Sequence, residues 1–552
     1  MVRRRAGFAG SIHPTPSEPE GVLVLALTAE NTLLVASVAP ATNAEAARAR
    51  EALADLPSSA ALELRLDGFA EAPAFSALRA CFEGRTLIAT VRSASEGGAF
   101  RGQTGEAQRL LSKALDAGFE FADLEFRRDG GDEAARISPS QRILSLHDPE
   151  GIPADVSALV ARMLSSGARY VKLVATANDS GDARRLLELQ AERGDGRLTI
   201  FGMGEAGIAT RALAPYLGAA LSYGGLLPGH VTAPGQLLAR DLAETYGVAR
   251  QRKASRLFGL LGGVVSHSLS PVLHNANFEA LGLDALYVPF AMRMLGRELG
   301  PLVASLDALG LPLIGASVTI PFKEEAALMA GTDEDGERAV NTLLRSSAPG
   351  QPLRLRGANT DRAAFEAVIE EASKGERREE EKGNVRVAIV LGAGGTARVA
   401  VDVLRKKGWE VFISNRTDAR GGDLAKEMGV HALSKKSEAP RPEPRVIVNA
   451  TSLGLRSVDP LPCDPALLRP GVLVIDAPYR DGGTELVRAA RAAGARVVDG
   501  QTLLLLQAAG QATLFTGRRT APRDLLERLP SRSRPAFSSA EGPLRALPEI
   551  FA

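Results

Sequence analysis

Short apolar, β-branched runs alternate with longer Ala-, Leu- and Arg-rich segments over the first half of the chain. The runs have the length of buried strands and the longer segments have helical spacing, which is the pattern of repeated βα units. Helices are expected at Glu106–Ala117, Asp155–Ser166 and Asp182–Arg193. Eight repeats within about 225 residues predict a (β/α)₈ TIM barrel. The eight expected strands are Val22–Thr28, Ala61–Leu66, Thr86–Arg92, Phe119–Phe126, Arg142–His147, Tyr170–Val174, Leu198–Gly202 and Ala219–Tyr223.

A second α/β pattern follows from about Arg256. Val385–Leu391 predicts a buried strand, followed by a glycine-rich turn and a helix at Arg398–Lys407. This order of strand, turn and helix is typical of a parallel sheet that binds a dinucleotide. Further strands of this sheet are expected at Glu410–Ser414, Arg445–Asn449, Val472–Asp476 and Arg496–Val498.

Composition and charge narrow the classes of partner. Among 552 residues, 66 Lys and Arg balance 65 Asp and Glu, so no strong field directs the chain to nucleic acid or to a membrane surface. No apolar run has the length of a membrane-spanning helix. The two cysteines fit a reducing compartment, and no Cys or His spacing indicates a metal site. We therefore expect a soluble, cytoplasmic protein that acts on small molecules and holds no metal.

Polar residues at the expected carboxyl ends of the first set of strands are the candidates for chemistry, because TIM barrels place their active sites there. Lys172 lies within an apolar strand, where desolvation would disfavour its ammonium form and leave an amine able to attack a ketone. His147, on the preceding strand, would supply a proton carrier. Arg65, Arg92 and Arg211 would attract an anionic substrate. A lysine that extends from a strand edge into water, with ordinary surface arginines, is the alternative interpretation.

Five short motifs in order resemble type I 3-dehydroquinate dehydratase over residues 22–240. They are Glu63-Leu64-Arg65-Leu66-Asp67, Arg92-Ser93 followed by Glu96-Gly97-Gly98, Ser145-Leu146-His147-Asp148, Val171-Lys172-Leu173 and Ala233-Pro234-Gly235-Gln236.

This resemblance implies a Schiff base between Lys172 and the C3 ketone of 3-dehydroquinate. His147 would remove the C2 proton and protonate the departing C1 hydroxyl, which gives 3-dehydroshikimate. Asp123 would orient His147. The implied substrate contacts are ring hydroxyls at Glu63, Arg65 and Arg92, the carboxylate at Arg211, and the lid side of the site at Thr232 and Gln236.

The glycine-rich turn of the second half is Gly392-Ala393-Gly394-Gly395-Thr396-Ala397. The amino end of the helix after it would receive a pyrophosphate. A glycine-rich turn alone is weak evidence, but the next strand ends in Asn415-Arg416-Thr417. NAD sites usually carry an acidic residue at this place, whereas Arg416 would bind a 2′-phosphate. The pattern therefore favours NADP(H) as the cofactor.

A polar turn, Ser266-His267-Ser268-Leu269-Ser270-Pro271, precedes an expected helix and could either cap that helix or bind a polyol. Together with later motifs it makes residues 256–519 resemble shikimate dehydrogenase. The resemblance implies that Lys323 and Asp361 form the catalytic pair. It implies substrate contacts at Ser268, Ser270, Thr319, Asn341, Tyr479 and Gln507, and cofactor contacts at Gly392, Gly394, Gly395, Thr396, Ala397, Asn415, Arg416, Thr417, Thr451 and Gly500.

The chain departs from the pattern of this second family in three ways. The family usually has proline where this chain has Val264 and where it has Gly482 or Gly483, and it usually has glycine where this chain has Arg362. Arg362 matters most, because a guanidinium next to Asp361 could lower the pKa of the aspartate or crowd the cofactor.

The product of the first reaction is the substrate of the second, so the chain as a whole resembles a bifunctional type I 3-dehydroquinate dehydratase/shikimate dehydrogenase. Alternatives are a regulator that binds the metabolites without turnover, and a second half that prefers quinate. The expected organisation is a disordered tail at 1–20, the barrel at 21–250, a substrate-binding lobe at 256–372 completed by 501–520, a Rossmann NADP lobe at 385–500 and a C-terminal tail at 521–552.

Overall fold

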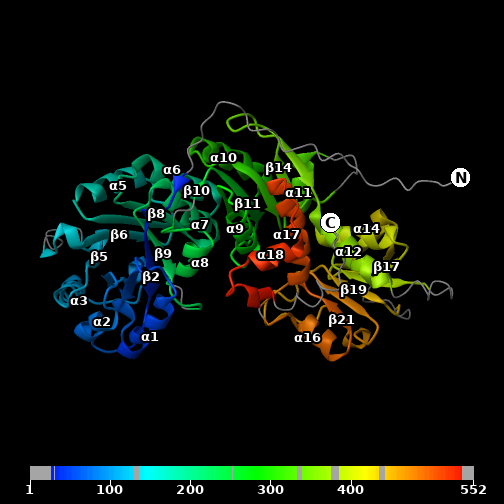
Figure 1. Cartoon of the computed structure of the whole chain (residues 1–552), viewed down its shortest axis with the longest axis horizontal. Helices are drawn as coiled ribbons and strands as arrows, with labels where there is room; N and C mark the ends of the chain where they lie inside the picture. The colour runs from blue at the N-terminus through cyan, green and yellow to red at the C-terminus, as the bar shows by residue number, and fades with distance from the viewer. Residues whose placement is uncertain are drawn as a thin grey trace.

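The computed structural model describes residues 27–29, 31–129, 136–229, 232–250, 253–331, 338–374, 385–433, 442–480 and 482–537. It contains an N-terminal barrel, a middle α/β lobe and a further α/β lobe, with the middle lobe between the other two (Figure 1). The expected N-terminal tail lies outside the described residues. No helix in the described part of the chain is both long and apolar enough to cross a membrane.

The barrel is an eight-stranded parallel sheet in which each strand is followed by a helix, as predicted. Hydrogen bonds run continuously from β8 through β2 to β9, and the ring closes where Ala220 N donates to Leu198 O at 3.0 Å. The strands are β2 (Leu33–Val38), β3 (Ala61–Arg65), β4 (Leu87–Thr90), β5 (Phe121–Glu125), β6 (Arg142–Asp148), β7 (Tyr170–Thr176), β8 (Leu198–Met203) and β9 (Leu221–Gly225). The helices are α1 (Asn43–Ala54), α2 (Phe75–Cys81), α3 (Thr104–Asp116), α4 (Phe126–Asp129), α5 (Val156–Ser165), α6 (Ser180–Arg193), α7 (Gly204–Leu213) and α8 (Ala239–Glu244).

The prediction of Val22–Thr28 as the first barrel strand is wrong. The strand between β3 and β9 is β2, which pairs in parallel with both neighbours. Of the predicted run, residues 22–26 lie outside the described chain, and β1 (Leu27–Thr28) pairs antiparallel with β10 (Lys253–Ala254) outside the barrel. Both segments are apolar and β-branched, and only pairing with two neighbours at once determines which of them enters the ring.

The middle lobe contains a five-stranded sheet in the order β12-β11-β13-β14-β15, in which β14 pairs antiparallel with both β13 and β15. Ser268 and Ser270 follow the carboxyl end of its first strand, and Thr319 follows the carboxyl end of its third strand. The strands are β11 (Arg256–Gly262), β12 (Ala285–Ala291), β13 (Leu313–Val318), β14 (Thr342–Arg345) and β15 (Leu355–Ala358). The helices are α9 (Ser270–Ala280), α10 (Leu295–Ala308), α11 (Lys323–Ala330) and α12 (Thr360–Lys374).

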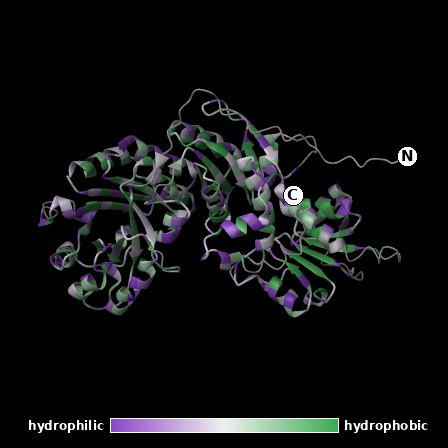
Figure 2. Cartoon of the chain, in the orientation of Figure 1, coloured by the Kyte–Doolittle hydropathy of each residue, from purple (hydrophilic) through white to green (hydrophobic). Residues whose placement is uncertain are grey.

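The third unit has the strand order of a Rossmann fold. Its sheet runs β18-β17-β16-β19-β20-β21, which is the order 3-2-1-4-5-6 in chain sequence. Its parallel strands are hydrophobic in Figure 2, as expected for a sheet covered on both faces. The strands are β16 (Val387–Leu391), β17 (Glu410–Ser414), β18 (His431–Ala432), β19 (Val446–Asn449), β20 (Leu473–Asp476) and β21 (Arg496–Val498). The helices are α14 (Gly395–Lys406), α15 (Asp418–Met428) and α16 (Glu485–Ala492).

The chain then continues into α17 (Gly500–Thr516), which packs against α9 and α12. The residues after Ala521 differ from the expected tail, because α18 (Pro522–Arg528) and a 3₁₀ turn at Arg534–Phe537 follow. Their apolar side chains provide the physical reason. Leu525, Leu529 and Phe537 are buried in one cluster with Leu273 of α9. Residues 538–552 lie outside the described chain.

Candidate active sites

Lys172 is buried inside the barrel in a setting of carboxylates and one aromatic ring. Its Nζ lies 2.7 Å from Asp123 Oδ2, 3.7 Å from Glu63 Oε1 and 4.1 Å from the centre of the Tyr223 ring. Burial by itself would raise the pKa of Asp123, but Lys172 and Arg92 lower it to about 2, so this carboxylate is ionised. The environment of Lys172 is thus a buried polar network and not the simply apolar one that its strand predicts.

Arg92, at the carboxyl end of β4, is the centre of that network. Its guanidinium donates to Asp123 at 2.9 Å, to Glu96 and Glu125 at 3.1 Å each, and to Ser145 at 3.0 Å. With these partners in place, Arg92 holds the carboxylates apart and fixes them. The role in hydroxyl binding that the family resemblance implies for Arg92 stays a prediction.

The expectation that Asp123 orients His147 is wrong, because Asp123 contacts Lys172 and Arg92. The group beside the imidazole is Glu96, whose Oε2 lies 3.2 Å from Nδ1 and accepts the His147 backbone N–H at 2.9 Å. Burial, followed by the charges of Arg92 and Lys172, lowers the pKa of His147 well below 6.5, so the ring is neutral near pH 7. A neutral imidazole in the same barrel mouth as Lys172 has the protonation state of a general base.

Glu96 is held at the barrel mouth by a tight turn. A Cβ at Gly98 would lie 2.1 Å from the carbonyl oxygen of Arg92, so the turn admits only glycine there. The motif Glu96-Gly97-Gly98 was visible in the sequence. Its partner His147 is 51 residues away, so only the fold identifies the contact.

Arg211 on α7 is buried and forms no ion pair with the residues that the structure describes. Its Nε and Nη2 atoms have no hydrogen-bond partner in the described part of the chain, and its guanidinium lies 4.5 Å from the centre of the Phe201 ring. Burial lowers its pKa to about 9, so it remains charged near neutral pH. A buried, charged and unpaired guanidinium is costly unless an anion completes it, which favours a carboxylate ligand.

Thr232 and Gln236 lie on the segment after β9 and meet the barrel mouth. The Gln236 side-chain oxygen accepts from the backbone and the hydroxyl of Thr232, at 2.7 and 3.1 Å. Thr232 Oγ1 lies 3.2 Å from Ser37 Oγ, and Ser37 in turn donates to Glu63. The predicted lid residues and Glu63 are therefore contiguous. Ser37, at the end of β2, was missed because the wrong run was assigned as the first strand.

The side chain of Arg65 is hydrogen-bonded to a neighbouring residue of its own loop. Its guanidinium donates to both carboxylate oxygens of Asp67 at 2.8 Å each. The substrate contact implied for Arg65 stays a prediction.

In the second half, Lys323 and Asp361 are in direct contact, as expected for a catalytic pair. Lys323 Nζ lies 2.5 Å from Asp361 Oδ2 and 3.3 Å from Thr396 Oγ1. Lys323 begins α11, Asp361 lies in the first turn of α12, and Thr396 lies in the first turn of α14. The ammonium thus stands where the substrate lobe meets the glycine-rich turn of the Rossmann lobe.

The predicted substrate residues of this half make the following hydrogen bonds. Asn341 donates to Gln507 at 3.1 Å and to Thr360 at 2.9 Å. The Tyr479 hydroxyl accepts from the backbone N–H of Leu269 at 3.4 Å, within the serine-rich turn. Ser268 Oγ accepts from the backbone of Ser270 at 3.2 Å, so this hydroxyl also caps the turn before α9. Thr319 lies just after β13 and donates its backbone N–H to Leu261 at 2.9 Å.

Arg362, the departure from the family pattern, forms an ion pair with a residue of the Rossmann lobe. Its guanidinium pairs with Asp402 of α14 at 2.5 Å. The salt bridge joins α12 to the Rossmann lobe and gives the arginine a partner other than Asp361.

The glycine-rich turn has the shape that a pyrophosphate requires. Gly392 has φ +112°, and a Cβ there would lie 2.9 Å from the carbonyl oxygen of Ala450. A Cβ at Gly394 would meet no atom within 4 Å, so open space faces the start of α14. Free N–H groups and the positive end of the helix dipole suit a phosphate at this point. Thr451 is fixed beside the turn by Asn449, which accepts from its hydroxyl at 2.7 Å.

Asn415, Arg416 and Thr417 follow the end of β17, next to the glycine-rich turn. Asn415 donates to the Thr417 carbonyl at 2.9 Å and so shapes the loop. Arg416 is exposed, and its side chain makes no hydrogen bond or ion pair with other described residues. Its free guanidinium and the adjacent phosphate cradle fit NADP(H). Gly500 starts α17, where a Cβ would lie 2.5 Å from the carbonyl oxygens of Ala477 and Pro478.

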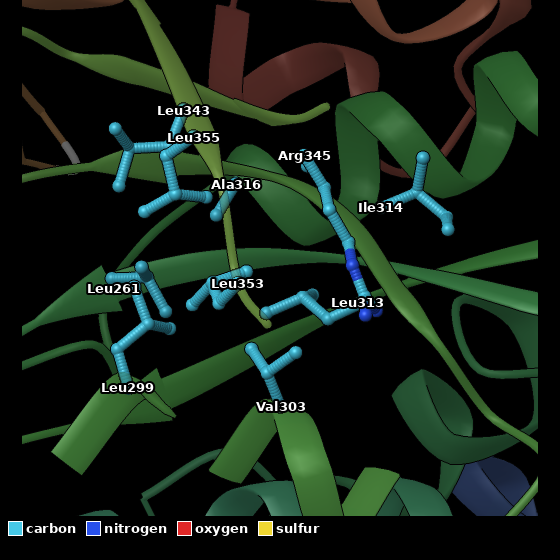
Figure 3. A pocket seen from close by; sticks show the side chains of 11 residues that line it. Leu261, Leu299, Val303, Leu313, Ile314, Ala316, Leu343, Arg345, Leu353 and Leu355 are labelled. Carbon is cyan, nitrogen blue, oxygen red and sulfur yellow. The ribbon is translucent and has the colours of Figure 1, made fainter. Parts of the chain in front are cut away.

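A small cavity lies elsewhere, within the aliphatic core of the middle lobe, and encloses about 10 Å³ (Figure 3). Leucine and valine side chains line it, and Arg345 at its edge is paired with Asp307 at 2.6 Å. None of the predicted substrate or cofactor residues lines this cavity, so it is a packing defect and not a part of either site.

The fold and the two sites define a class, in which a lysine-containing TIM barrel is joined to a dehydrogenase with a Rossmann cofactor lobe. Comparison with known families agrees. Residues 36–253 match the type I 3-dehydroquinase family, and residues 260–343 match the shikimate dehydrogenase substrate binding domain.

Among individual relatives, the chain is 31% identical over 510 residues to the chloroplastic bifunctional 3-dehydroquinate dehydratase/shikimate dehydrogenase of Arabidopsis thaliana, with 88% of this chain and 82% of the relative covered. Its second half is 42% identical over 273 residues to a shikimate dehydrogenase (NADP(+)) of Rubrobacter xylanophilus, covering 47% of this chain and 90% of the relative. A crystal structure of shikimate 5-dehydrogenase from Thermus thermophilus, in complex with NADP(H) and shikimate, is 33% identical with a TM-score of 0.40, covering 50% of this chain and 98% of that one.

The chain therefore belongs to the family of bifunctional 3-dehydroquinate dehydratases/shikimate dehydrogenases. It is a lyase and an NADP-dependent oxidoreductase of the shikimate pathway.

Proposed function

We propose that the two activities of this family are carried by two separate sets of side chains, Lys172 with His147 in the barrel and Lys323 with Asp361 between the other lobes. The observation that carries the proposal is the arrangement around Lys172. A buried lysine lies beside an ionised Asp123 and near a neutral His147, and an unpaired Arg211 occupies the same barrel. Nucleophile, base and anion receptor are the three groups that imine-based dehydration of an anionic ketone needs.

In the barrel, the Lys172 ammonium would first release a proton to solvent, and the neutral Nζ would then attack the C3 carbonyl of 3-dehydroquinate and, with loss of water, form an imine. The imine withdraws electrons, so the C2 proton becomes acidic and His147 Nε2 can accept it. The C1–O bond then breaks, and the imidazolium returns the proton to the leaving hydroxyl, which departs as water. Hydrolysis of the imine releases 3-dehydroshikimate and restores Lys172. Glu96, beside Nδ1, orients the ring throughout.

The substrate carboxylate would bind Arg211, whose Nε and Nη2 atoms have no hydrogen-bond partner among the described residues. Glu63 accepts hydrogen bonds from Ser37 and, at 2.8 Å, from Thr90, and would receive a ring hydroxyl on the same side. Thr232 and Gln236 would close over the ring, because Thr232 contacts Ser37 and Gln236 holds Thr232. Arg65 and Arg92 would supply the remaining hydroxyl contacts.

In the second site, Ser268, Ser270, Asn341 and Gln507 would bind the carboxylate and hydroxyls of 3-dehydroshikimate, with Thr319 and Tyr479 beside them. Lys323 would give a proton to the C3 oxygen as it is reduced, and Asp361 would hold that ammonium in place. NADPH, when bound, supplies the hydride. Gly392, Gly394, Gly395, Thr396 and Ala397 would hold its pyrophosphate, Asn415, Arg416 and Thr417 its 2′-phosphate, and Thr451 and Gly500 the nicotinamide side.

The test supplies 3-dehydroquinate and NADPH to the whole chain and follows enone absorbance and NADPH consumption together. Both signals are expected, with shikimate as the product. Borohydride added during turnover should fix substrate mass on the peptide that contains Lys172. The Lys172→Ala variant should take up none, whereas the control Lys323→Ala should be labelled like the wild type. Labelling at another lysine would overturn the barrel assignment.

Three finer assignments also belong to the proposal. The second site prefers shikimate to quinate, which parallel turnover of the two compounds would test. The chain divides into barrel, substrate lobe and Rossmann lobe at about residues 250 and 372–385, and limited proteolysis followed by mass spectrometry would test these boundaries. The protein resides in the cytoplasm, which cell fractionation would test.

A further inference from the structure

Helix α7 belongs to the barrel but also contacts the middle lobe. Arg211, near its end, faces the barrel interior, whereas Ile208 is buried in a cluster with Phe258 and Phe278 of the middle lobe. The same helix therefore borders one active site and supports the domain that carries the other. Its first turn carries Glu205, which the reaction of the barrel does not use.

The Glu205 carboxylate crosses the domain boundary to the loop between β11 and α9. Its Oε2 accepts from the backbone N–H groups of Val265 at 3.0 Å and Ser266 at 3.2 Å, and its Oε1 accepts from the Ser266 hydroxyl at 2.5 Å. Three donors thus converge on one carboxylate from another domain. Val265 is buried, so its N–H would lose its partner if Glu205 were removed.

Three further contacts hold this loop: Gly263 N–H donates to the Ile320 carbonyl at 3.1 Å, the Val265 side chain is buried, and Leu269 N–H donates to the Tyr479 hydroxyl at 3.4 Å. None of these contacts involves Ser266, whose backbone N–H and hydroxyl both donate to Glu205. Val264, Ser266 and His267 are exposed, and the turn is closed by a hydrogen bond from Ser268 N to the Val265 carbonyl at 3.2 Å. Ser268 and then Ser270 follow directly, and they are the residues to which the proposed function assigns the substrate carboxylate. A shift of Val265 and Ser266 would therefore move both hydroxyls.

We infer that Glu205 is a positioning residue for the dehydrogenase reaction, supplied by the dehydratase domain, which fixes the serine loop in the geometry that binds 3-dehydroshikimate. The inference rests on the proposed role of Ser268 and Ser270. In this arrangement the barrel has two roles. It carries the dehydratase site, and it also supports the substrate loop of the dehydrogenase site.

The interface offers a matched control. Glu298 of α10 crosses in the opposite direction, and its Oε2 accepts the Ser180 hydroxyl of α6 at 2.6 Å. Ser180→Ala thus removes a hydroxyl-to-carboxylate hydrogen bond at the same boundary without touching the serine loop. Ser266→Ala removes the corresponding hydrogen bond to Glu205.

The experiment measures both activities of the full-length chain. Glu205→Ala should raise the KM for 3-dehydroshikimate about tenfold, the size expected for hydrogen bonds to a charged acceptor, while kcat stays within about twofold. The KM for NADPH and the dehydratase constants should not change, and normal dehydratase activity reports a folded protein. Glu205→Gln should restore most of the affinity, because its amide oxygen can accept both N–H groups. Ser266→Ala should raise the KM less than Glu205→Ala, and Ser180→Ala should leave it unchanged.

The inference is overturned if Glu205→Ala leaves this KM within twofold, if kcat falls while the KM stays, or if Ser180→Ala raises the KM equally. A similar rise in the dehydratase KM would also overturn it, because the effect would then be general. The Ser270→Ala variant distinguishes a failure of the role inferred for Glu205 from a failure of the substrate role proposed for the serine loop. If Ser270→Ala raises the KM and Glu205→Ala does not, only the role of Glu205 fails. If neither raises it, the proposed substrate role of the serine loop fails as well.

Discussion

Oε2 of Glu96 lies 3.2 Å from Nδ1 of His147 and also accepts the histidine's backbone N–H. The two groups have opposite shifts. Burial and the neighbouring cations lower the pKa of His147 well below 6.5, whereas burial raises the pKa of Glu96 to about 7 although Arg92 opposes that rise. Near neutral pH the imidazole is therefore neutral, and the titrating member of the pair is Glu96.

This difference predicts the pH profile of the dehydratase. As pH falls from 8 to 6, Glu96 gains a proton while His147 stays neutral, so an inflection of kcat/KM near pH 7 reports Glu96. Glu96→Gln should abolish that inflection and lower kcat about tenfold, because the ring loses its charged orienting partner. The profile is measured from pH 5 to 9 with 3-dehydroquinate. An inflection near pH 6.5 that survives Glu96→Gln would identify His147 as the titrating group and contradict the prediction.

Arg211 is expected to favour substrate affinity at the expense of stability. Its buried guanidinium forms no ion pair with the described residues, so the free enzyme bears a cost on the order of 3–5 kcal/mol for an uncompensated buried charge. Arg211→Met keeps the volume and removes the charge. The variant should raise the thermal midpoint of the ligand-free protein and raise the dehydratase KM about a hundredfold, since a charge-assisted bidentate contact is lost. Lower stability together with an unchanged KM would show that Arg211 does not bind the substrate carboxylate.

Cofactor choice is expected to depend on Arg416, which is exposed and free of protein partners in the described chain. A guanidinium and a 2′-phosphate form a charge-assisted pair worth about 1.5–3 kcal/mol, so Arg416→Ala should reduce the preference for NADPH over NADH roughly ten- to a hundredfold. Arg496→Ala removes an exposed arginine at the opposite, amino end of the same sheet and is the control. Equal use of NADH by the wild type would refute the prediction.

The parts of the fold that the sequence predicted are those specified by local pattern. The strand at Glu410–Ser414 was predicted with its observed bounds, because its short apolar run is followed directly by turn residues. Lys172 was a candidate because an ionisable residue within an apolar strand stands out, whereas the role predicted for Lys323 depends on the family resemblance. The first barrel strand was not predicted, because two apolar runs competed and only the closure of the ring decides between them.

The contacts that the sequence could not supply join residues far apart in the chain. Asp123 and Glu96 were equally available as partners of His147, and the choice depends on how the turn after β4 folds over the barrel mouth. The destination of the Arg362 side chain likewise depends on α14 of another lobe. Glu205 carried no signal at all, because a carboxylate that stabilises a loop 60 residues away in another domain resembles any surface acid in the sequence.

The division of labour between the two sites predicts complementation between two inactive variants. Lys323 and Asp361 share no contact with Lys172 and His147 in the described chain, so loss of one pair should leave the reaction of the other pair intact. Lys323→Ala is expected to convert 3-dehydroquinate to 3-dehydroshikimate at about the wild-type rate and to consume no appreciable NADPH, because the proton donor of the second site is missing. His147→Ala should show the reverse, with loss of dehydratase activity by about two to four orders of magnitude and normal reduction of added 3-dehydroshikimate.

Mixing the two variants should restore the conversion of 3-dehydroquinate to shikimate, since the intermediate can leave one molecule and enter another. If either substitution abolishes both reactions in a protein with wild-type circular dichroism, the two sites share a catalytic group and the assignment of two separate centres is wrong.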